Sequence, residues 1–457
     1  MSSGGRLRAP LRLLAAVMAL GCSLATGVTA LADAPNDPGF ALQWALAGSP
    51  SSIHAPQAWC ANLGGVLVAD VDTGADFGHQ DLAGKLVAGA QFLGGNGKQT
   101  GSGQAAVQDD QGHGTMTTGL MVADTNNGVG IAGVAPAATA LIVKVLKTDP
   151  KDPNKASGYG PDVAAGIEYA STYPGVKVIN LSIGSDVSPL LGIVNLQSNP
   201  ILPAIQHAWA RGVLVVAASG NNQNNQTDYS SVADQALIAG ALARSGAQAG
   251  YSSPGSNVDA PGGDAPKDQS GKPQPTVDTS ILSTDVGNRY AVGDGTSFAA
   301  PMVAGTAAML SARGLSAPEI RDQILRTESN GTHLNAAAAL GRADNGPICP
   351  PGSTGSAPPA GSLNIKQSSP PRRVTPATAR PAQVVPQVAL ASPSPSPSPS
   401  PLESPTPLQD TMPSPRALAH PPSTPPPSGP APVAIVAVIA AVGAAGLGGL
   451  RLLQLVR

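Results

Sequence analysis

Short runs of β-branched and aliphatic residues alternate with alanine-rich segments of helical spacing through most of the chain, and this alternation restricts the fold strongly. Four runs have the length and composition of strands buried on both faces, at residues 65–69, 140–145, 176–181 and 212–218. Helical segments lie between them, for example at 161–171 and 201–211. Strands that alternate with helices pair in parallel through right-handed crossovers. The sequence therefore predicts a three-layer α/β domain, with a mostly parallel central sheet flanked by helices.

The charge and cysteine content exclude two classes of protein. Charged residues are 12% of the chain, where about 25% is usual in soluble domains. The 26 Lys and Arg against 28 Asp and Glu give a formal net charge of −2, so we expect no nucleic-acid partner. Three cysteines exclude a disulfide-dense scaffold and allow at most one bridge.

Residues 1–32 have the pattern of a secretory signal peptide. Arginines at positions 6, 8 and 12 lie at the start of an apolar stretch, and Ala30-Leu31-Ala32 suits signal peptidase. The alternatives are a retained membrane anchor or a lipoprotein signal ending at Cys22, but the apolar stretch is short and interrupted. We therefore expect the mature chain to begin with a globular domain at 33–345.

Residues 346–431 have the composition of a disordered linker. They are rich in Pro, Ser, Ala and Thr, and 24 of the 46 prolines of the chain lie between Pro350 and Pro430. Such a segment has too little apolar surface to offset its ordering entropy, and alternating prolines favour an extended polyproline II conformation. The sequence predicts a spacer or stalk here; a ligand for a proline-binding module is the alternative.

Residues 432–450 form an uncharged stretch of 19 residues, which is long enough for a helix that spans a bilayer. Arg451 and Arg457 follow it, so the positive-inside preference places the tail 451–457 in the cytoplasm and the large domain outside. A buried core helix is the alternative, but little chain follows against which it would pack. The sequence predicts a single-pass protein of the cell membrane with an extracellular domain.

Three separate motifs carry residues suited to acyl transfer. Asp72 ends a predicted buried strand, His113 opens a helix of small residues between two glycines, and Ser297 begins another helix whose first turn contains Pro301. Each has a simpler alternative: a turn carboxylate, a surface histidine and a helix N-cap. Nucleophilic catalysis requires a hydroxyl, a base that takes its proton and a carboxylate that orients the base. The three residues together supply that set.

The order Asp, His, Ser and the motifs at 68–82, 113–119 and 295–301 resemble those of the subtilisin-like serine proteases, the subtilases. The resemblance covers about residues 35–343 and implies a subtilisin-like fold and a serine endopeptidase acting on polypeptides. It assigns Asp72 to orienting the base, His113 to proton transfer and Ser297 to nucleophilic attack. No cofactor is expected for the chemistry.

The same resemblance assigns further roles. Asn221 takes the role of the family's oxyanion donor, with a turn residue as the alternative. The strand that pairs with the substrate backbone and the walls of the first pocket are predicted at Ser182, Ile183, Gly184, Ala218, Ser219 and Gly220. The chain departs from the family at Met116, where a second histidine is usual, and at Thr118, where alanine is usual. These departures predict altered packing near His113.

A structural calcium ion is a further implication of the resemblance. Asp37, Asp81 and Asn127 occupy positions that match a calcium site of many subtilases, and ordinary turn residues are the alternative. Cys60 and Cys349 lie near the two ends of the domain. In an oxidising extracellular setting they are candidates for a disulfide, but the sequence leaves their separation open.

The arrangement of segments resembles that of the mycosins, membrane-anchored subtilases of type VII secretion. Shared features are the signal, the Pro-rich linker, the C-terminal span and the lack of a long propeptide between signal and domain. This resemblance implies an alternative function, in which the protein is a partly structural component of a secretion complex.

Overall fold

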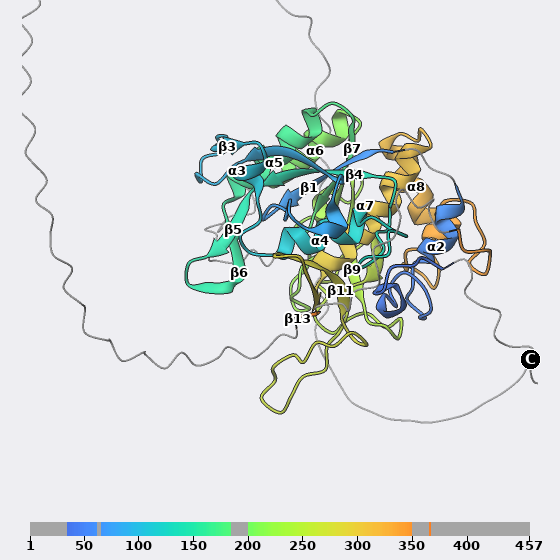
Figure 1. The fold of residues 1–457 in the computed structure, drawn as a ribbon. Coiled ribbons are helices and arrows are strands. Elements are labelled where there is room, and N and C mark those ends of the chain that lie inside the picture. Colours follow the sequence, from blue (N-terminus) through green and yellow to red (C-terminus); the bar gives the residue numbers. More distant parts are fainter. Residues whose placement is uncertain (1–33, 62–64, 184–199, 350–364, 367–457) are drawn as a thin grey trace, which may run out of the picture. The chain divides into compact units, whose positions relative to one another are not determined.

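A computed structural model describes residues 34–61, 65–183, 200–349 and 365–366 (Figure 1). The predicted signal peptide at 1–32, membrane helix at 432–450 and tail at 451–457 lie outside the described residues, as does nearly all of the predicted linker. The chain divides into two units, Met1–Thr375 and Pro376–Arg457, and every described residue belongs to the first. Within the described residues, no helix combines the length and apolarity needed to cross a membrane.

The centre of the domain is an eight-stranded sheet in the order β10-β9-β8-β7-β1-β4-β2-β3. Neighbouring strands are parallel except for β2 and β3 at one edge. Each of the four predicted runs forms a strand of this sheet, so the predicted fold class is confirmed. The strands are β1 (Leu67–Asp72), β2 (Leu86–Gln91), β3 (Gly101–Ser102), β4 (Thr139–Lys144), β7 (Val176–Leu181), β8 (Leu214–Ala218), β9 (Ala236–Leu242) and β10 (Val258–Pro261).

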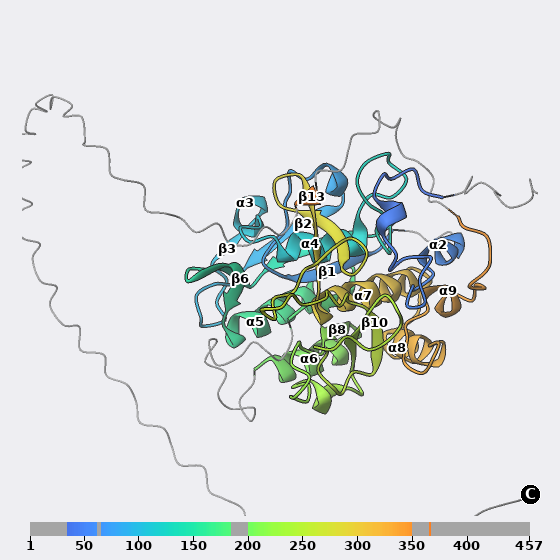
Figure 2. The same ribbon diagram turned by 90° about the horizontal axis from the view of Figure 1, so that it is seen from below.

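Helices cover both faces of the sheet, as predicted. In Figures 1 and 2, α5 (Gly160–Thr172) and α6 (Ile201–Ala210) lie on one side, while α4 (His113–Val122) and α7 (Thr296–Ala312) lie on the other. The second side also carries three shorter helices that pack near α7. These are α2 (Ala55–Ala58), α8 (Ala317–Arg326) and α9 (Ala336–Ala339). A further short helix, α3 (Gln104–Val107), packs near β2. Within the described residues, 3-10 helices lie at Phe40–Leu42, Trp59–Ala61, Gln80–Leu82 and Ser230–Val232.

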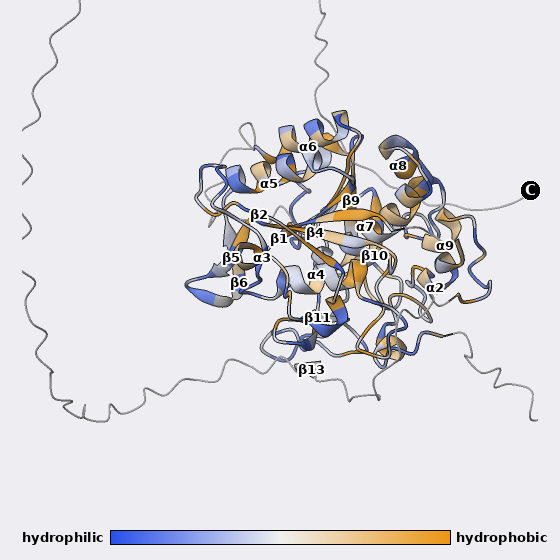
Figure 3. Cartoon of the chain, turned by 45° about the horizontal axis from the view of Figure 1, so that its top comes forward, coloured by the Kyte–Doolittle hydropathy of each residue, from blue (hydrophilic) through white to orange (hydrophobic). Residues whose placement is uncertain are grey.

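Alternate residues of each central strand belong to two different hydrophobic cores. In β1, Val68 packs with α4 and α7, whereas Ala69 and Val71 pack with α5 and α6. The central strands are accordingly hydrophobic in Figure 3, while a two-stranded hairpin at residues 146–158 is hydrophilic at its tip. Because side chains alternate along a strand, Asp70 and Asp72 must point to the same face as Val68, toward α4 and α7.

Two smaller sheets lie outside the central one. β5 (Leu146–Asp149) and β6 (Asp152–Gly158) form an antiparallel hairpin. β11 (Ile281–Asp285) and β12 (Arg289–Gly293) are antiparallel, and the two-residue strand β13 (Ile365–Lys366) pairs in parallel with β12. The contacts place β11 against α4, so this sheet covers the helix that begins at His113.

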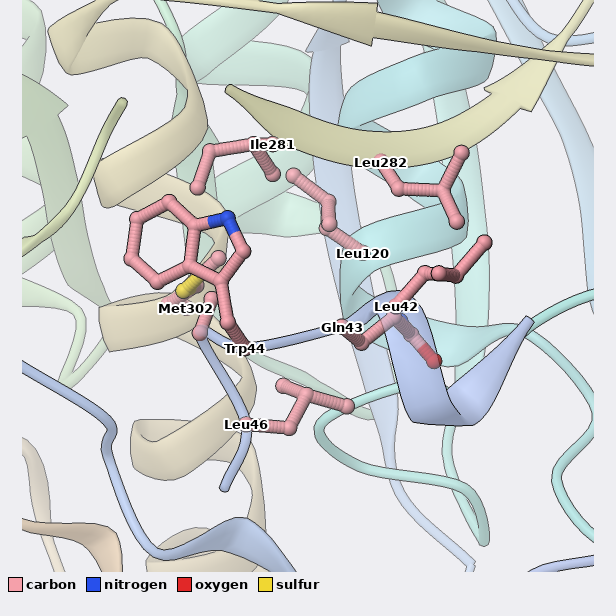
Figure 4. Close-up of a pocket in the computed structure, with 9 residues that line it drawn as sticks. Leu42, Gln43, Trp44, Leu46, Leu120, Ile281, Leu282 and Met302 are labelled. Atoms are coloured by element: carbon pink, nitrogen blue, oxygen red, sulfur yellow. The ribbon is translucent and has the colours of Figure 1, made fainter. Parts of the chain in front are cut away.

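The N-terminal segment closes over the α4 and α7 side of the domain. The indole Nε1 of Trp44 donates to the carbonyl oxygen of Ser280 at 3.1 Å. Figure 4 shows the Trp44 ring beside Ile281 and Met302, in a small apolar pocket that Leu120 also lines. Burial of a large aromatic ring of this kind stabilises the segment against the rest of the domain.

A disulfide joins Cys60 and Cys349, which are 289 residues apart in the sequence. The backbone N–H of Cys349 also donates to the carbonyl oxygen of Pro56 at 3.1 Å. The structure thus settles the pairing that the sequence left open, and the bridge ties the beginning of the domain to its end.

Candidate active site

Asp72 and His113 form the first part of the site. Asp72 is the last residue of β1 and is 1% exposed, while His113 is the first residue of α4. The two carboxylate oxygens lie 2.8 and 2.9 Å from Nδ1 of His113. The helix starts close enough for this contact because Gly114 has no side chain: a Cβ there would lie 2.1 Å from the carbonyl oxygen of Gly74. The sequence around the histidine therefore allows α4 to pack directly on the end of β1.

The charge around His113 favours its protonated form. Burial of the ring lowers its pKa, but the negative charge of Asp72 and the hydrogen bond to it outweigh that effect. The charges of Asp70 and Asp109 act in the same direction as Asp72, and the pKa of His113 is raised overall. The ring is thereby prepared to accept and hold a proton during a reaction.

Ser297 lies at the start of α7 and is 9% exposed. It is the second residue of the helix, one position later than predicted, because α7 begins at Thr296. The alternative reading of Ser297 as an N-cap is wrong, since Gly295 occupies the capping position. A Cβ on Gly295 would lie 2.9 Å from the Ser297 hydroxyl oxygen, so glycine leaves space at the nucleophile.

Pro301 lies inside α7 and not in its first turn, which corrects the prediction. Proline has no backbone N–H to donate to the carbonyl oxygen four residues earlier, which here belongs to Ser297. The hydroxyl group of Ser182 donates to that oxygen instead, at 2.8 Å. At the point where α7 lacks one helical hydrogen bond, it is thus bound to the chain that follows β7.

The start of α4, the start of α7 and the segment after β8 approach one another. The ring of His113 lies 5.9 Å, centroid to centroid, from that of Phe298, the residue after Ser297. The Nδ2 atom of Asn221 lies 3.6 Å from the Cβ position of Gly295, close to the Ser297 hydroxyl. Three chain segments that are far apart in the sequence thus meet at one site.

Thr296 fixes the orientation of the Asn221 amide. The Oδ1 atom of Asn221 accepts hydrogen bonds from the backbone N–H of Thr296 at 2.9 Å and from its hydroxyl at 3.1 Å. The same hydroxyl accepts from the backbone N–H of Gly220 at 3.1 Å. With its oxygen held in this way, the amide has a fixed orientation. The role of Asn221 as an oxyanion donor stays a prediction.

Residues 64–343 match the model of the Subtilase family. The chain belongs to this family. It is 37% identical over 311 residues to Thermitase of Thermoactinomyces vulgaris, with 67% of this chain and 96% of that protein covered. It is 34% identical over 286 residues to Subtilisin BL of Lederbergia lenta, with 61% and 90% covered. The solved structure of a protease from Pseudoalteromonas arctica matches 67% of this chain and 98% of its own, with a TM-score of 0.55 and 27% identity.

The family and its relatives make this subtilase a serine endopeptidase. The predicted triad residues, Asp72, His113 and Ser297, lie at the end of a strand and at the starts of two helices. In parallel sheets the carboxyl ends of the strands meet at one edge, which is where ligands bind. The end of β1 and the segment after β7, which Ser182 joins to Ser297, lie at that edge.

The predicted substrate-binding residues of the subtilase lie at the same edge. Ser182 and Ile183 follow the end of β7, and Ala218 ends β8 with Ser219 and Gly220 after it. All five are buried. Gly184 lies outside the described residues. The roles of these residues stay predictions.

The two departures from the family have different surroundings. The carbonyl oxygen of Met116 accepts from the hydroxyl of Ser283 at 2.6 Å, and its side chain packs near Gly293. Thr118 donates its hydroxyl to the carboxylate of Asp70 at 2.6 Å. The sequence analysis assigned no role to Asp70 or to Thr296. A carboxylate inside an otherwise apolar strand was the available signal for the first, and nothing in the pattern indicated the second.

The three residues of the predicted calcium site lie together. Asn127 donates its backbone N–H to Asp37 at 3.2 Å and its side-chain Nδ2 to Asp81 at 3.1 Å. Burial raises the pKa of Asp37 to about 6 and that of Asp81 to about 8. Among the residues that the structure describes, no group of three or more His, Cys, Asp or Glu side chains is suited to a metal ion.

The donors of this site nevertheless fit a calcium ion. Two buried carboxylates and an amide are hard oxygen donors, and a divalent cation offsets the cost of burying both charges. In the structure the Oδ1 atom of Asn127 accepts from the backbone N–H of Val129 at 2.7 Å, so its nitrogen faces Asp81. Ligation of an ion by the oxygen of this amide would require the amide to turn.

Proposed function

We propose that this subtilase is an extracellular endopeptidase anchored in the cell membrane by its C-terminal segment. The Asp72 and His113 pair beside Ser297 is the observation that carries the endopeptidase activity. The anchoring rests on the sequence alone: a signal-type segment at 1–32, a Pro-rich linker at 346–431 and an uncharged stretch at 432–450. The peptidase domain would then act at a distance from the membrane set by the linker.

The reaction follows from the positions of the hydrogen bonds. Nδ1 of His113 is bound to Asp72, so Nε2 is the ring nitrogen that takes the proton as Ser297 attacks the peptide carbonyl carbon. The oxyanion that forms accepts hydrogen bonds from Asn221 and a backbone N–H. Collapse of the intermediate breaks the C–N bond, and His113 returns its proton to the leaving amine. Water then attacks the acyl-enzyme by the same route and releases the acid.

Asp72 keeps the imidazole in the reactive tautomer. Its two oxygens both lie within hydrogen-bond distance of Nδ1, so the proton on that nitrogen is fixed. The carboxylate also stabilises the imidazolium formed during the attack. Polypeptide substrates would bind in an extended conformation along the segment after β7, as an added strand.

The activity is tested by a fluorophosphonate probe, which reacts with an activated serine and needs no known substrate. The purified full-length chain is expected to be labelled, and the Ser297→Ala variant is expected not to be. Labelling of both proteins, or of neither, contradicts the proposed chemistry. For the anchor, the full-length chain is expected in the membrane fraction of expressing cells and a chain ending at residue 431 in the medium.

We also propose calcium as a structural ligand at Asp37, Asp81 and Asn127, supported by the burial of the two carboxylates. Calcium at millimolar concentration is expected to raise the melting temperature of the full-length chain, and EDTA to lower it. Asp81→Asn is expected to remove the response to calcium, while Asp268→Asn, at an exposed loop carboxylate, keeps it. An equal response of the two variants contradicts the site.

A partly structural function in a secretion complex is the second proposal, favoured by the mycosin-like order of the segments. Ser297→Ala removes the nucleophile and leaves the rest of the chain intact. If the secretion complex still exports its substrates in the Ser297→Ala strain, but no longer does so when the protein is deleted, the result supports the structural function. Secretion that is lost in both strains supports proteolysis as the function.

A further inference from the structure

Asp70 is a second buried carboxyl group beside the triad, and the reaction described above does not use it. It lies two residues before Asp72 in β1 and is 1% exposed. Both side chains therefore point toward α4 and α7. A carboxyl group inside an apolar strand is costly unless hydrogen bonds compensate for the loss of water. The partners of Asp70 thus indicate what it holds in place.

One oxygen of Asp70 is bound to the helix that carries His113. Thr117 and Thr118 donate their hydroxyl groups to Oδ2 of Asp70 at 2.9 and 2.6 Å. Thr117 lies one helical turn after His113 and so on the same side of α4. The departure at Thr118, which only predicted altered packing, supplies the shorter of the two bonds.

The other oxygen of Asp70 is connected by a series of hydrogen bonds to the helix that carries Ser297. Nδ2 of Asn180, in β7, donates to Oδ1 of Asp70 at 2.8 Å and also to the hydroxyl oxygen of Ser182 at 2.9 Å. Ser182 in turn donates to the carbonyl oxygen of Ser297 at 2.8 Å, where Pro301 leaves α7 without a donor. A continuous chain of hydrogen bonds therefore runs from α4 through Asp70 to the nucleophile's own residue.

The charges that face Asp70 are few. α7 contains no ionisable side chain, and α4 contains only His113. β4 and β7 each contribute one lysine, of which Lys144 is bound to Asp110 and Lys177 is exposed. Burial and the charge of Asp72 raise the pKa of Asp70 to about 7, against its three side-chain hydrogen bonds. Its negative charge, when present, raises the pKa of His113.

We propose that Asp70 is a positioning residue of the peptidase: its carboxyl group fixes α4 relative to α7. The inference rests on the serine endopeptidase function of the site. Asp70 does not touch the substrate or the reacting atoms in this proposal. It sets the position of the base and of the nucleophile through Thr117, Thr118, Asn180 and Ser182.

The test compares full-length variants by peptide hydrolysis, probe labelling and thermal melting. Asp70→Val removes every bond of the carboxyl group, and Asp70→Asn removes its charge but keeps its shape. Asp259→Asn is the matched control, because that buried carboxylate is also held by two hydroxyl groups, those of Ser256 and Thr332, at 2.7 and 2.5 Å. It joins β10 to a loop and has no bond to the triad.

We expect Asp70→Val to lower kcat by about tenfold or more with KM nearly unchanged, since small displacements of reacting groups are costly. Asp70→Asn is expected to recover most of kcat. A kcat for Asp70→Val no lower than that of Asp259→Asn overturns the inference. A kcat for Asp70→Asn no higher than that of Asp70→Val also overturns it.

Thr118 provides a second route if Asp70→Val does not fold. Thr118→Ala removes one hydroxyl and no charge, and is expected to lower kcat; Thr118→Ser restores the hydroxyl and is expected to restore kcat. Equal kcat values for the two variants overturn the inference. If the wild-type chain fails to react with the probe, the endopeptidase function itself is overturned, and the inference with it.

Discussion

Single hydrogen bonds decide which atoms of the site react. Asp72 occupies one ring nitrogen of His113, which leaves the other for the nucleophile. Thr296 holds the oxygen of the Asn221 amide, which sets the orientation of that group. In both cases a neighbour orients a side chain that has two polar ends.

Loss of the Asn221 amide should therefore slow the chemical step. We expect Asn221→Ala to lower kcat by about 10²–10³, the loss found for such a donor in subtilisin, with little change in KM. The matched control is Asn222→Ala, since Asn222 directs its side-chain oxygen to the backbone N–H of Asn224. Steady-state kinetics on one peptide substrate measure both. Similar losses in the two variants contradict the role of Asn221.

The pH dependence of the reaction should follow the raised pKa of His113. The base works only when neutral, so a raised pKa means that activity is lost as the pH falls through a higher value than usual. The midpoint of the acid limb of kcat/KM is expected above 6.5, the ordinary value for histidine. A pH profile with an uncharged peptide substrate measures it. A midpoint at or below 6.5 contradicts the electrostatic account.

Strands and helices were predictable where the apolar residues followed a single pattern, that of a strand or that of a helix. Val176–Leu181 is a strand with the bounds that were predicted, because all of its residues except the exposed Lys177 are buried between the two layers of helices. The start of α7 was less predictable: Ser297 and Pro301 suggested a cap and a first turn, yet the helix begins at Thr296 and passes through the proline. The side chain of Ser182, which follows β7, donates to the carbonyl oxygen that the proline leaves without its helix bond, and no local pattern shows such a partner.

The hydrogen bond between Ser182 and α7 should make a measurable contribution to the free energy of unfolding. Ser182→Ala leaves the carbonyl oxygen of Ser297 buried without a donor, which costs about 1–3 kcal/mol. Thr306→Val is the control, since its hydroxyl donates to the Met302 carbonyl at 3.0 Å, where the regular helix bond is also present. Urea unfolding measures both. A loss for Thr306→Val as large as that for Ser182→Ala contradicts the role of the proline gap.

The site was predictable only in part, for a related reason. Asp72, His113 and Ser297 lie in distinctive short motifs; the structure binds Asp72 to His113 and places Phe298, the residue after Ser297, beside the His113 ring. Asp70 sits in the first of those motifs, but its partners come from α4 and β7. Which long-range contacts satisfy a buried carboxyl group depends on how the elements pack, and the sequence of one strand does not contain that information.

The disulfide is the longest covalent connection within the described domain. It links positions 289 residues apart, so its removal releases a large loop in the unfolded chain. The double variant Cys60→Ser with Cys349→Ser is expected to lose about 2–5 kcal/mol of unfolding free energy. Cys22→Ser is the control, since the sequence places that cysteine in the signal segment. Thermal melting that is the same in the double variant and the control contradicts the bridge.

The position of the bridge also determines how the domain responds to force. A pull on the chain beyond residue 349 reaches Cys349 first and passes through the sulfur atoms to Cys60. The load then bypasses α8 and α9, which would otherwise be peeled from the domain one after the other. A peptidase tethered at its carboxyl end would in this way resist mechanical unravelling for as long as the bridge stays oxidised.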